Sequence, residues 1–157
     1  MAANLSGRQL TDESLPRQLE ELMAATSMPR GSLWLEVTET SLVRDLELAA
    51  QVTRQISDLG IYLSIDDFGT GWASLTYLRQ FSIHALKIDR SFVDALGKER
   101  RAEVIVRSVI SLGAELDIAV VAEGIETEDQ RQRLLRLGCV VGQGYLFGRP
   151  QGAEALG

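Results

Sequence analysis

Residues 59–69 read Leu-Gly-Ile-Tyr-Leu-Ser-Ile-Asp-Asp-Phe-Gly, and this stretch decides the class of the fold. Its first half, Ile61–Ile65, is short and rich in β-branched and aromatic residues, which predicts a β-strand. The segment before it carries an apolar stripe at helical spacing: Ala49, Val52, Ile56 and Leu59. Gly60 then predicts the end of that helix. A helix that leads directly into a strand is typical of α/β proteins.

The same alternation of short strands and longer helices runs along the chain. Strands are predicted over residues 3–6, 33–37, 61–65, 85–88, 118–122 and 140–147. Helices are predicted over about 12–25, 49–60, 101–115 and 127–138, the last with a capping-box pattern at Thr127–Gln130. The inner face expected for the 101–115 helix is Val104, Ile105, Ser108, Val109 and Leu112. This order implies parallel strands joined by right-handed crossovers, and leaves an open doubly wound sheet and a barrel as alternatives.

Length and composition limit the classes of protein. A chain of 157 residues, 45% hydrophobic and 24% charged, is the size of one globular domain. Its apolar runs are strand-length and its first residues lack a signal-peptide pattern, so no membrane segment is expected. A formal net charge of −6 argues against DNA or RNA as a partner. The single cysteine, Cys139, cannot form an intrachain disulfide, which favours a cytoplasmic protein.

Polar side chains gather where the predicted strands end. Carboxylates lie at or just after these points: Glu36, Asp66, Asp67, Asp89, Glu123 and Glu126. An amide or an ammonium group lies at three further strand ends: Asn4, Lys87 and Gln143. Functional groups of parallel α/β folds gather at this edge, and carboxylates that converge there repel one another unless a cation lies between them. Such oxygen ligands suit Mg²⁺ or Mn²⁺, so the pattern predicts a metal site.

Each of these residues taken alone also has a structural interpretation. A single carboxylate after a strand is commonly a solvated loop residue or a helix cap. Lys87 and Asp89, two residues apart on one strand, would form an internal ion pair. His84 has no cysteine or other histidine beside it and is expected to be structural, and Cys139 is expected to be a small core residue. The coincidence of so many acidic strand ends favours the metal site.

Five motifs occur in a fixed order: Glu36–Thr40 (EVTET), Asp66–Gly71 (DDFGTG), Leu86–Asp89 (LKID), Ala122–Thr127 (AEGIET) and Gly142–Tyr145 (GQGY). Together with Asn4-Leu5-Ser6, this series closely resembles the EAL domain family of bacterial cyclic-di-GMP phosphodiesterases, over about residues 3–150. The resemblance implies an α/β fold of the TIM-type (β/α) barrel. It also implies a cytoplasmic hydrolase that converts cyclic-di-GMP to linear pGpG at a two-metal site of Mg²⁺ or Mn²⁺.

The resemblance implies a role for each matched residue. Ligands of one metal ion are matched by Asn4, Glu36 and Asp66, and ligands of a second ion by Asp66, Asp67 and Glu123. The catalytic residues it implies are Lys87, Glu123, Asp66 and Asp67, with Lys87 holding and polarising the attacking water and Asp89 close by. Glu39 matches a glutamate that anchors the loop containing Gly69 and Thr70, which in the family lies near a dimer interface. Supporting polar positions around metal and substrate are matched by Glu126 and Gln143.

The chain departs from the family pattern at its start. The Glu-Ala-Leu motif of the family's first strand, whose glutamate binds the first metal, has no counterpart, and neither has the arginine that follows it. The match at Glu154–Leu156 lies after the last predicted strand and is expected to be accidental. The predicted strands supply about six of the eight βα units of a barrel, which typically takes about 250 residues. We therefore expect residues 1–157 to form a single partial EAL domain, its open side covered by a second copy, a partner or more of a longer protein.

Three functions remain as alternatives. The first is a metal-dependent phosphodiesterase, which the matched site residues favour. The second is a catalytically inactive remnant that binds cyclic-di-GMP or another protein, which the missing glutamate favours. The third is a different Mg²⁺-dependent barrel enzyme with Lys87 as its base, and the DDFGTG segment argues against it.

Overall fold

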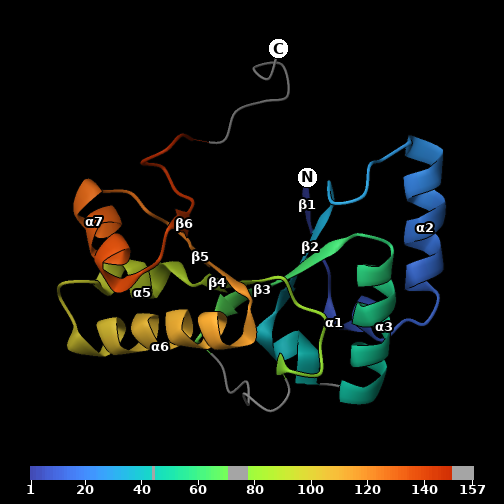
Figure 1. Cartoon of the computed structure of the whole chain (residues 1–157), viewed down its shortest axis with the longest axis horizontal. Helices are drawn as coiled ribbons and strands as arrows, with labels where there is room; N and C mark the ends of the chain where they lie inside the picture. Colours follow the sequence, from blue (N-terminus) through green and yellow to red (C-terminus); the bar gives the residue numbers. More distant parts are fainter. Residues whose placement is uncertain (44, 71–77, 150–157) are drawn as a thin grey trace.

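The computed structural model describes residues 1–43, 45–70 and 78–149, and within them it holds one parallel sheet (Figure 1). Six strands pair in chain order: β1 (Ala2–Asn4), β2 (Trp34–Thr38), β3 (Tyr62–Phe68), β4 (Ala85–Ile88), β5 (Ala119–Ala122) and β6 (Val141–Gly142). All five pairings are parallel, which confirms the sequence prediction of an α/β fold.

Helices connect the strands. The described helices are α1 (Gly7–Leu10), α2 (Leu15–Thr26), the 3₁₀ helix η1 (Glu39–Val43), α3 (Leu46–Asp58), α5 (Arg90–Ala95), α6 (Arg100–Leu116) and α7 (Glu128–Leu137). In Figure 1, α2 and α3 lie at one end of the sheet, while α5, α6 and α7 lie at the other. The predicted ends of α3 and α7 are confirmed, because Gly60 has a φ of 78° and Thr127 forms a capping box with Gln130.

The order of the strands separates a barrel from a doubly wound sheet. Right-handed crossovers that always advance in the same direction place every connecting helix on one face of the sheet. A doubly wound sheet instead reverses its strand order, which puts helices on both faces. Because the order here runs from β1 to β6 without a reversal, the sheet is part of a barrel wall. Within the described residues β1 and β6 are its two edges, so the wall is not closed.

The core lies between this wall and the helices. Alternate residues of the central strands, such as Leu63, Ile65 and Leu86, are fully buried and belong to the cluster that includes Ile56 of α3 and Val106 of α6. Residues between them on the strands point to the opposite, inner face of the wall. The inner face carries the polar side chains, and the candidate site is built on it.

Two details of the prediction were wrong. The strand predicted over 140–147 is only two residues long, since residues after Gly142 turn to bond the loop that follows β5: the Ile125 N–H donates to the Gln143 carbonyl at 3.0 Å, and the Leu146 N–H donates to the Ile125 carbonyl at 3.0 Å. The inner face of α6 was predicted only in part: Val109 is buried, and Ile105 and Leu112 pack against the core, as expected. Its buried residues are Ala102, Val106, Val109 and Gly113, and Val104 is 55% exposed.

The reason for the α6 shift lies at Gly113. A Cβ atom at this position would lie 2.3 Å from a methyl group of Val120 and 2.8 Å from the Ile118 carbonyl. The helix therefore approaches β5 along its small residues, so its largest apolar side chains do not mark the face that packs closest.

Candidate metal centre

An ammonium group lies among carboxylates on the inner face of the wall. Lys87 projects from β4 and its Nζ atom lies 3.0 Å from Glu36 of β2, 3.2 Å from Asp66 of β3 and 2.6 Å from Glu123, just after β5. The lysine side chain is 8% exposed and the three carboxylates are 17–21% exposed. Four neighbouring strands thus bring their polar residues to one point, as parallel topology predicts for the carboxyl ends of strands.

A β-bulge brings a further carboxylate to the same point. Between Ile65 and Phe68 the register of β3 against β4 shifts, and Asp67 takes a left-handed backbone conformation with a φ of 54°. In a regular strand, consecutive residues point to opposite faces. The bulge relaxes that rule, and carboxylate oxygens of Asp66, Asp67 and Glu123 all lie within 4.8 Å of one another. This spacing fits ligands that share one small cation.

Glu36, Asp66, Asp67 and Glu123 are called the acidic cluster below. Burial, followed by the charges of Asp66 and Asp89, raises the pKa of the Asp67 carboxyl. Burial also raises the pKa of Glu123, against the lowering effect of the Lys87 ammonium. Burial by itself would lower the pKa of Lys87, but its hydrogen bonds to Glu123 and Glu36 raise that pKa above its usual value. One ammonium therefore faces four carboxylates, and the excess of negative charge favours a divalent cation.

The other predicted site residues lie around the acidic cluster. The amide of Gln143 donates to Glu123 at 2.7 Å, so β6 supports the carboxylate that follows β5. Asn4 is exposed at the end of β1, in register with Glu36 of β2. Asp89 does not pair with Lys87 in the described structure; it caps α5 by accepting hydrogen bonds from the backbone N–H and the hydroxyl of Ser91.

The loop after β3 is held by Glu39. This glutamate is 4% exposed, and its carboxylate accepts a hydrogen bond from the Gly69 N–H at 3.2 Å. The hydroxyl of Thr70 donates to the Asp67 carbonyl at 2.8 Å. Gly69 has a φ of 99°, a conformation that favours glycine. Glu39 therefore fixes the backbone immediately after the bulge that orients Asp67. The last residue of the DDFGTG motif, Gly71, lies outside the described residues.

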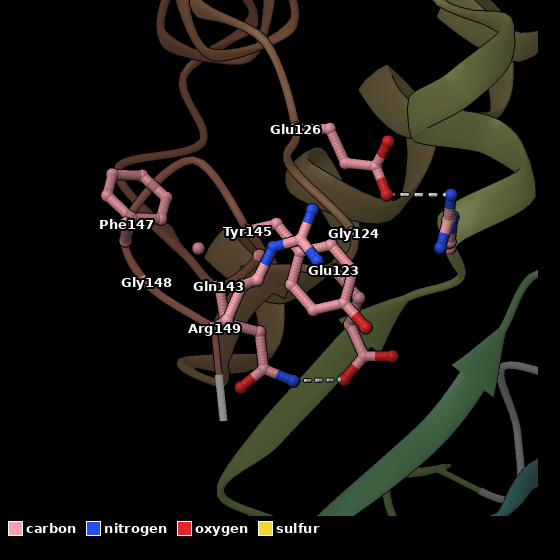
Figure 2. Close-up of a pocket in the computed structure, with 11 residues that line it drawn as sticks. Glu123, Gly124, Glu126, Gln143, Tyr145, Phe147, Gly148 and Arg149 are labelled. Carbon is pink, nitrogen blue, oxygen red and sulfur yellow. Dashed lines mark hydrogen bonds and ion pairs between the residues drawn. The ribbon is translucent and has the colours of Figure 1, made fainter. Parts of the chain in front are cut away.

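A pocket opens beside the acidic cluster, with a volume of about 680 Å³ (Figure 2). Glu123, Gln143 and Tyr145 line it, and Figure 2 shows the amide of Gln143 beside the carboxylate of Glu123. Two arginines also line it. Arg90 pairs with Glu126 at 2.8 Å, and the Arg149 guanidinium lies 5.1 Å from the centre of the Tyr145 ring. Glu126 thus lies on the pocket wall, away from the ion pairs of Lys87.

Comparison with known proteins identifies the fold around this site. A family model described as the EAL domain matches residues 1–150. The chain belongs to the EAL domain family. It is 41% identical over 156 residues to the bifunctional diguanylate cyclase/cyclic di-GMP phosphodiesterase MucR of Pseudomonas aeruginosa, a match that covers 99% of this chain and 23% of MucR. It is 35% identical over 150 residues to the cyclic di-GMP phosphodiesterase RocR of the same organism, covering 96% of this chain and 38% of RocR.

Solved EAL structures agree with this assignment. The PaMucR phosphodiesterase in its c-di-GMP complex superposes with a TM-score of 0.93 at 41% identity, covering 99% of this chain and 63% of that chain. The EAL domain of Mycobacterium smegmatis DcpA gives a TM-score of 0.91 at 37% identity, covering 99% of this chain and 70% of that chain. This EAL domain therefore has the TIM-like barrel fold in incomplete form. Its sequence spans only about a fifth to two fifths of the length of curated relatives such as MucR and RocR.

Sequence reasoning missed several residues in this EAL domain. Arg90 and Arg149 line the pocket, yet no periodicity or charge pattern singles them out, whereas Tyr145 belongs to the GQGY motif. Ser64 was also missed. It is a buried polar residue between the apolar residues Leu63 and Ile65 of β3, and that placement can be seen in the sequence. Among the helices of the described residues, none is long and apolar enough to cross a membrane.

Proposed function

We propose that this EAL domain hydrolyses cyclic-di-GMP to linear pGpG with two Mg²⁺ or Mn²⁺ ions. The observation that carries the proposal is the convergence of three carboxylates on one ammonium at the carboxyl edge of the wall, with a fourth carboxylate, Asp67, within 4.8 Å of two of them. The match to the cyclic di-GMP phosphodiesterase RocR and to the PaMucR c-di-GMP complex supports the substrate. The distances within the acidic cluster fit divalent cations with oxygen ligands.

The acidic cluster supplies the ligands in this proposal. Asp66, Asp67 and Glu123 would hold one ion, and Asp66 would share the other with Glu36 and Asn4. Two divalent cations held by these residues would lower the pKa of a bound water and neutralise charge that develops on a phosphodiester. Lys87, which stays cationic at neutral pH, would hold and orient that water through an N–H donor. Glu123, which accepts hydrogen bonds from Lys87 and Gln143, would keep both groups directed at the site.

The reaction would open one of the two phosphodiesters of the cyclic dinucleotide. The water oxygen forms a bond to phosphorus and the bond from phosphorus to the ribose oxygen on the far side breaks. That ribose oxygen leaves as a hydroxyl by taking up the proton that the water loses, so one water is consumed and the ring opens. The pocket beside Glu123 would hold a neighbouring part of the substrate, with Arg90 or Arg149 near its phosphate and Tyr145 offering a ring face to a base. Asp89 and the Glu39-anchored loop would keep Asp67 in place.

The test measures linear pGpG formed from cyclic-di-GMP by the purified 157-residue chain in Mn²⁺ or Mg²⁺. Asp66→Asn should lower turnover by more than about a hundredfold, since even the groups that support a metal ligand are worth 10–100-fold. Asp58→Asn makes the same chemical change at an exposed position on α3 and should leave turnover unchanged. Turnover that survives Asp66→Asn would contradict the assigned role.

A second function, binding of cyclic-di-GMP without turnover, is favoured by the place of Asn4. This residue is exposed at the edge of the wall, so one proposed ligand of the first ion lies open to water. Equilibrium binding of cyclic-di-GMP with Mn²⁺ and with chelator separates the two functions. Tight binding without any pGpG would establish the binding module. Absence of both binding and turnover in a folded chain would remove both functions.

We also propose that the inner face of the wall is covered in solution by a second copy or by further polypeptide. Ala119 and Val141, both inward-facing, are exposed at this face, and the two edge strands leave backbone groups unpaired within the described residues. Sedimentation velocity over a range of concentrations tests the first possibility. A monomer at all concentrations would exclude self-association.

A further inference from the structure

Ser64 is a buried hydroxyl with no partner, directly beside the acidic cluster. It is the inward residue of β3 one pleat before Asp66, and it lies between Glu36 of β2 and Ala85 of β4 in the sheet register. Its residue is 2% exposed, and within the described part of the chain its Oγ is the one buried side-chain N or O atom that lacks a hydrogen bond. Such a group has lost its water without replacement and lowers stability.

The Lys87 ammonium reaches across β3, the strand that carries this serine. Lys87 lies two residues beyond Ala85 on β4, yet its ammonium reaches Glu36 on β2. Since β3 lies between those two strands, the lysine passes over the inward residues of β3, which at this level are Ser64 and Asp66. The inner face is exposed elsewhere, for example at Val141, so the burial of Ser64 comes from the side chains of the site itself.

The partners of Lys87 are the same groups that the proposed function assigns to metal ions. An ammonium has three N–H donors, and here it lies within 3.2 Å of three carboxylates. If the oxygens of Glu36, Asp66 and Glu123 that face Lys87 bound divalent cations, they would no longer accept from Lys87, and the cations would repel its charge. A buried ammonium then needs another acceptor, because an unpaired buried charge is strongly unfavourable.

We infer that the Ser64 hydroxyl becomes this acceptor, and that Ser64 is a positioning residue for Lys87 in the metal-bound state. The inference rests on the proposed two-metal function and adds a residue to it. It accounts for a buried hydroxyl without a partner at this position of β3: its partner arrives only when the acidic cluster is engaged. Ser64 then holds the ammonium on the inner face, where the attacking water is to be oriented.

The test compares Mn²⁺ dissociation constants of the 157-residue chain by isothermal titration calorimetry. Ser64→Ala should weaken Mn²⁺ binding about tenfold, the loss expected for one hydrogen bond to a charged group. Its melting temperature in chelator should stay equal or rise, because the variant removes an unsatisfied group. Thr53→Val is the matched control: Thr53 is fully buried on α3, and its hydroxyl is satisfied by the Ala50 carbonyl at 3.0 Å. This control should lower the melting temperature in chelator and leave Mn²⁺ binding unchanged.

A second measurement asks whether the effect passes through Lys87. In a Lys87→Met background, Ser64→Ala should change Mn²⁺ affinity by less than about twofold, since coupled residues lose their interaction when either is absent. Equal Mn²⁺ affinity for the wild-type chain and Ser64→Ala overturns the inference alone, as does a tenfold loss that persists with Lys87→Met. If the folded wild-type chain binds no Mn²⁺, the two-metal function fails and takes this inference with it.

Discussion

Replacing Lys87 with methionine tests whether the lysine ammonium stabilises the acidic cluster. The substitution keeps an aliphatic side chain of similar length and removes the ammonium that lies 3.0, 3.2 and 2.6 Å from Glu36, Asp66 and Glu123. Removing one member of a fully buried ion pair costs about 3–5 kcal/mol. The three carboxylates here are 17–21% exposed, so water relieves part of that penalty. We therefore expect Lys87→Met to lower the free energy of unfolding in chelator by about 2–4 kcal/mol, less than for a fully buried ion pair.

For a chain of 157 residues this loss corresponds to a fall in melting temperature of about 5–15 °C. Circular dichroism in chelator at pH 7 measures it. Millimolar Mn²⁺ should reduce the deficit, because a cation replaces the missing positive charge. The sign of the pH effect follows from the pKa of Lys87, which is raised above its usual 10.5. The stability that this lysine contributes is therefore complete below pH 10.5 and is lost only as the pH rises through the folded-state pKa.

An exposed ion pair supplies the comparison. Arg131 lies 2.6 Å from Glu128 on α7, and its side chain is 41% exposed. Arg131→Met should cost less than about 1 kcal/mol, as surface pairs do. If Lys87→Met lowers the melting temperature no more than Arg131→Met, the acidic cluster is not held together by the lysine. If Mn²⁺ leaves the Lys87→Met deficit undiminished, the cluster is not a cation site.

Two further predictions concern residues outside the cluster. His84, the one histidine of the sequence, accepts a hydrogen bond from the Leu63 N–H through Nδ1, and burial lowers its pKa below 6.5. The unfolded chain therefore takes up the proton first, so stability should fall as the pH drops from 7.5 to 5.5, and thermal melts of His84→Gln should lose that component. Gly144 and Gly148 have φ values of 157° and 159°, but a Cβ at Gly144 would lie 2.2 Å from the Ile125 carbonyl oxygen, and one at Gly148 would meet nothing within 4 Å. Gly144→Ala should lower the free energy of unfolding, measured in urea, by about 1–3 kcal/mol. A similar decrease for Gly148→Ala would contradict the steric explanation.

Much of the fold could be predicted because it is encoded locally. The helix that ends at Gly60 and the helix that begins at Thr127 each depend on a few neighbouring residues, and both ends are confirmed. The inner face of α6 was predicted only in part, because it depends on how closely Gly113 approaches β5, which is a packing contact between the helix and the strand that follows it. The last strand was predicted too long because the turn after Gly142 is set by hydrogen bonds to the loop around Ile125.

The candidate site divides in the same way. The sequence by itself determined which residue types stand at the strand ends, and it placed the chain in its family, because motif order and residue type need no coordinates. Only the tertiary structure decided that Lys87 lies among Glu36, Asp66 and Glu123 while Asp89 caps a helix. The alternation of a strand would place Lys87 and Asp89 on the same face, but β4 ends at Ile88 and Asp89 already begins α5. The bulge at Asp66 and Asp67 and the unpaired hydroxyl of Ser64 also appeared only in three dimensions. Both depend on the register between β3 and its neighbours, and register is a property of the whole sheet.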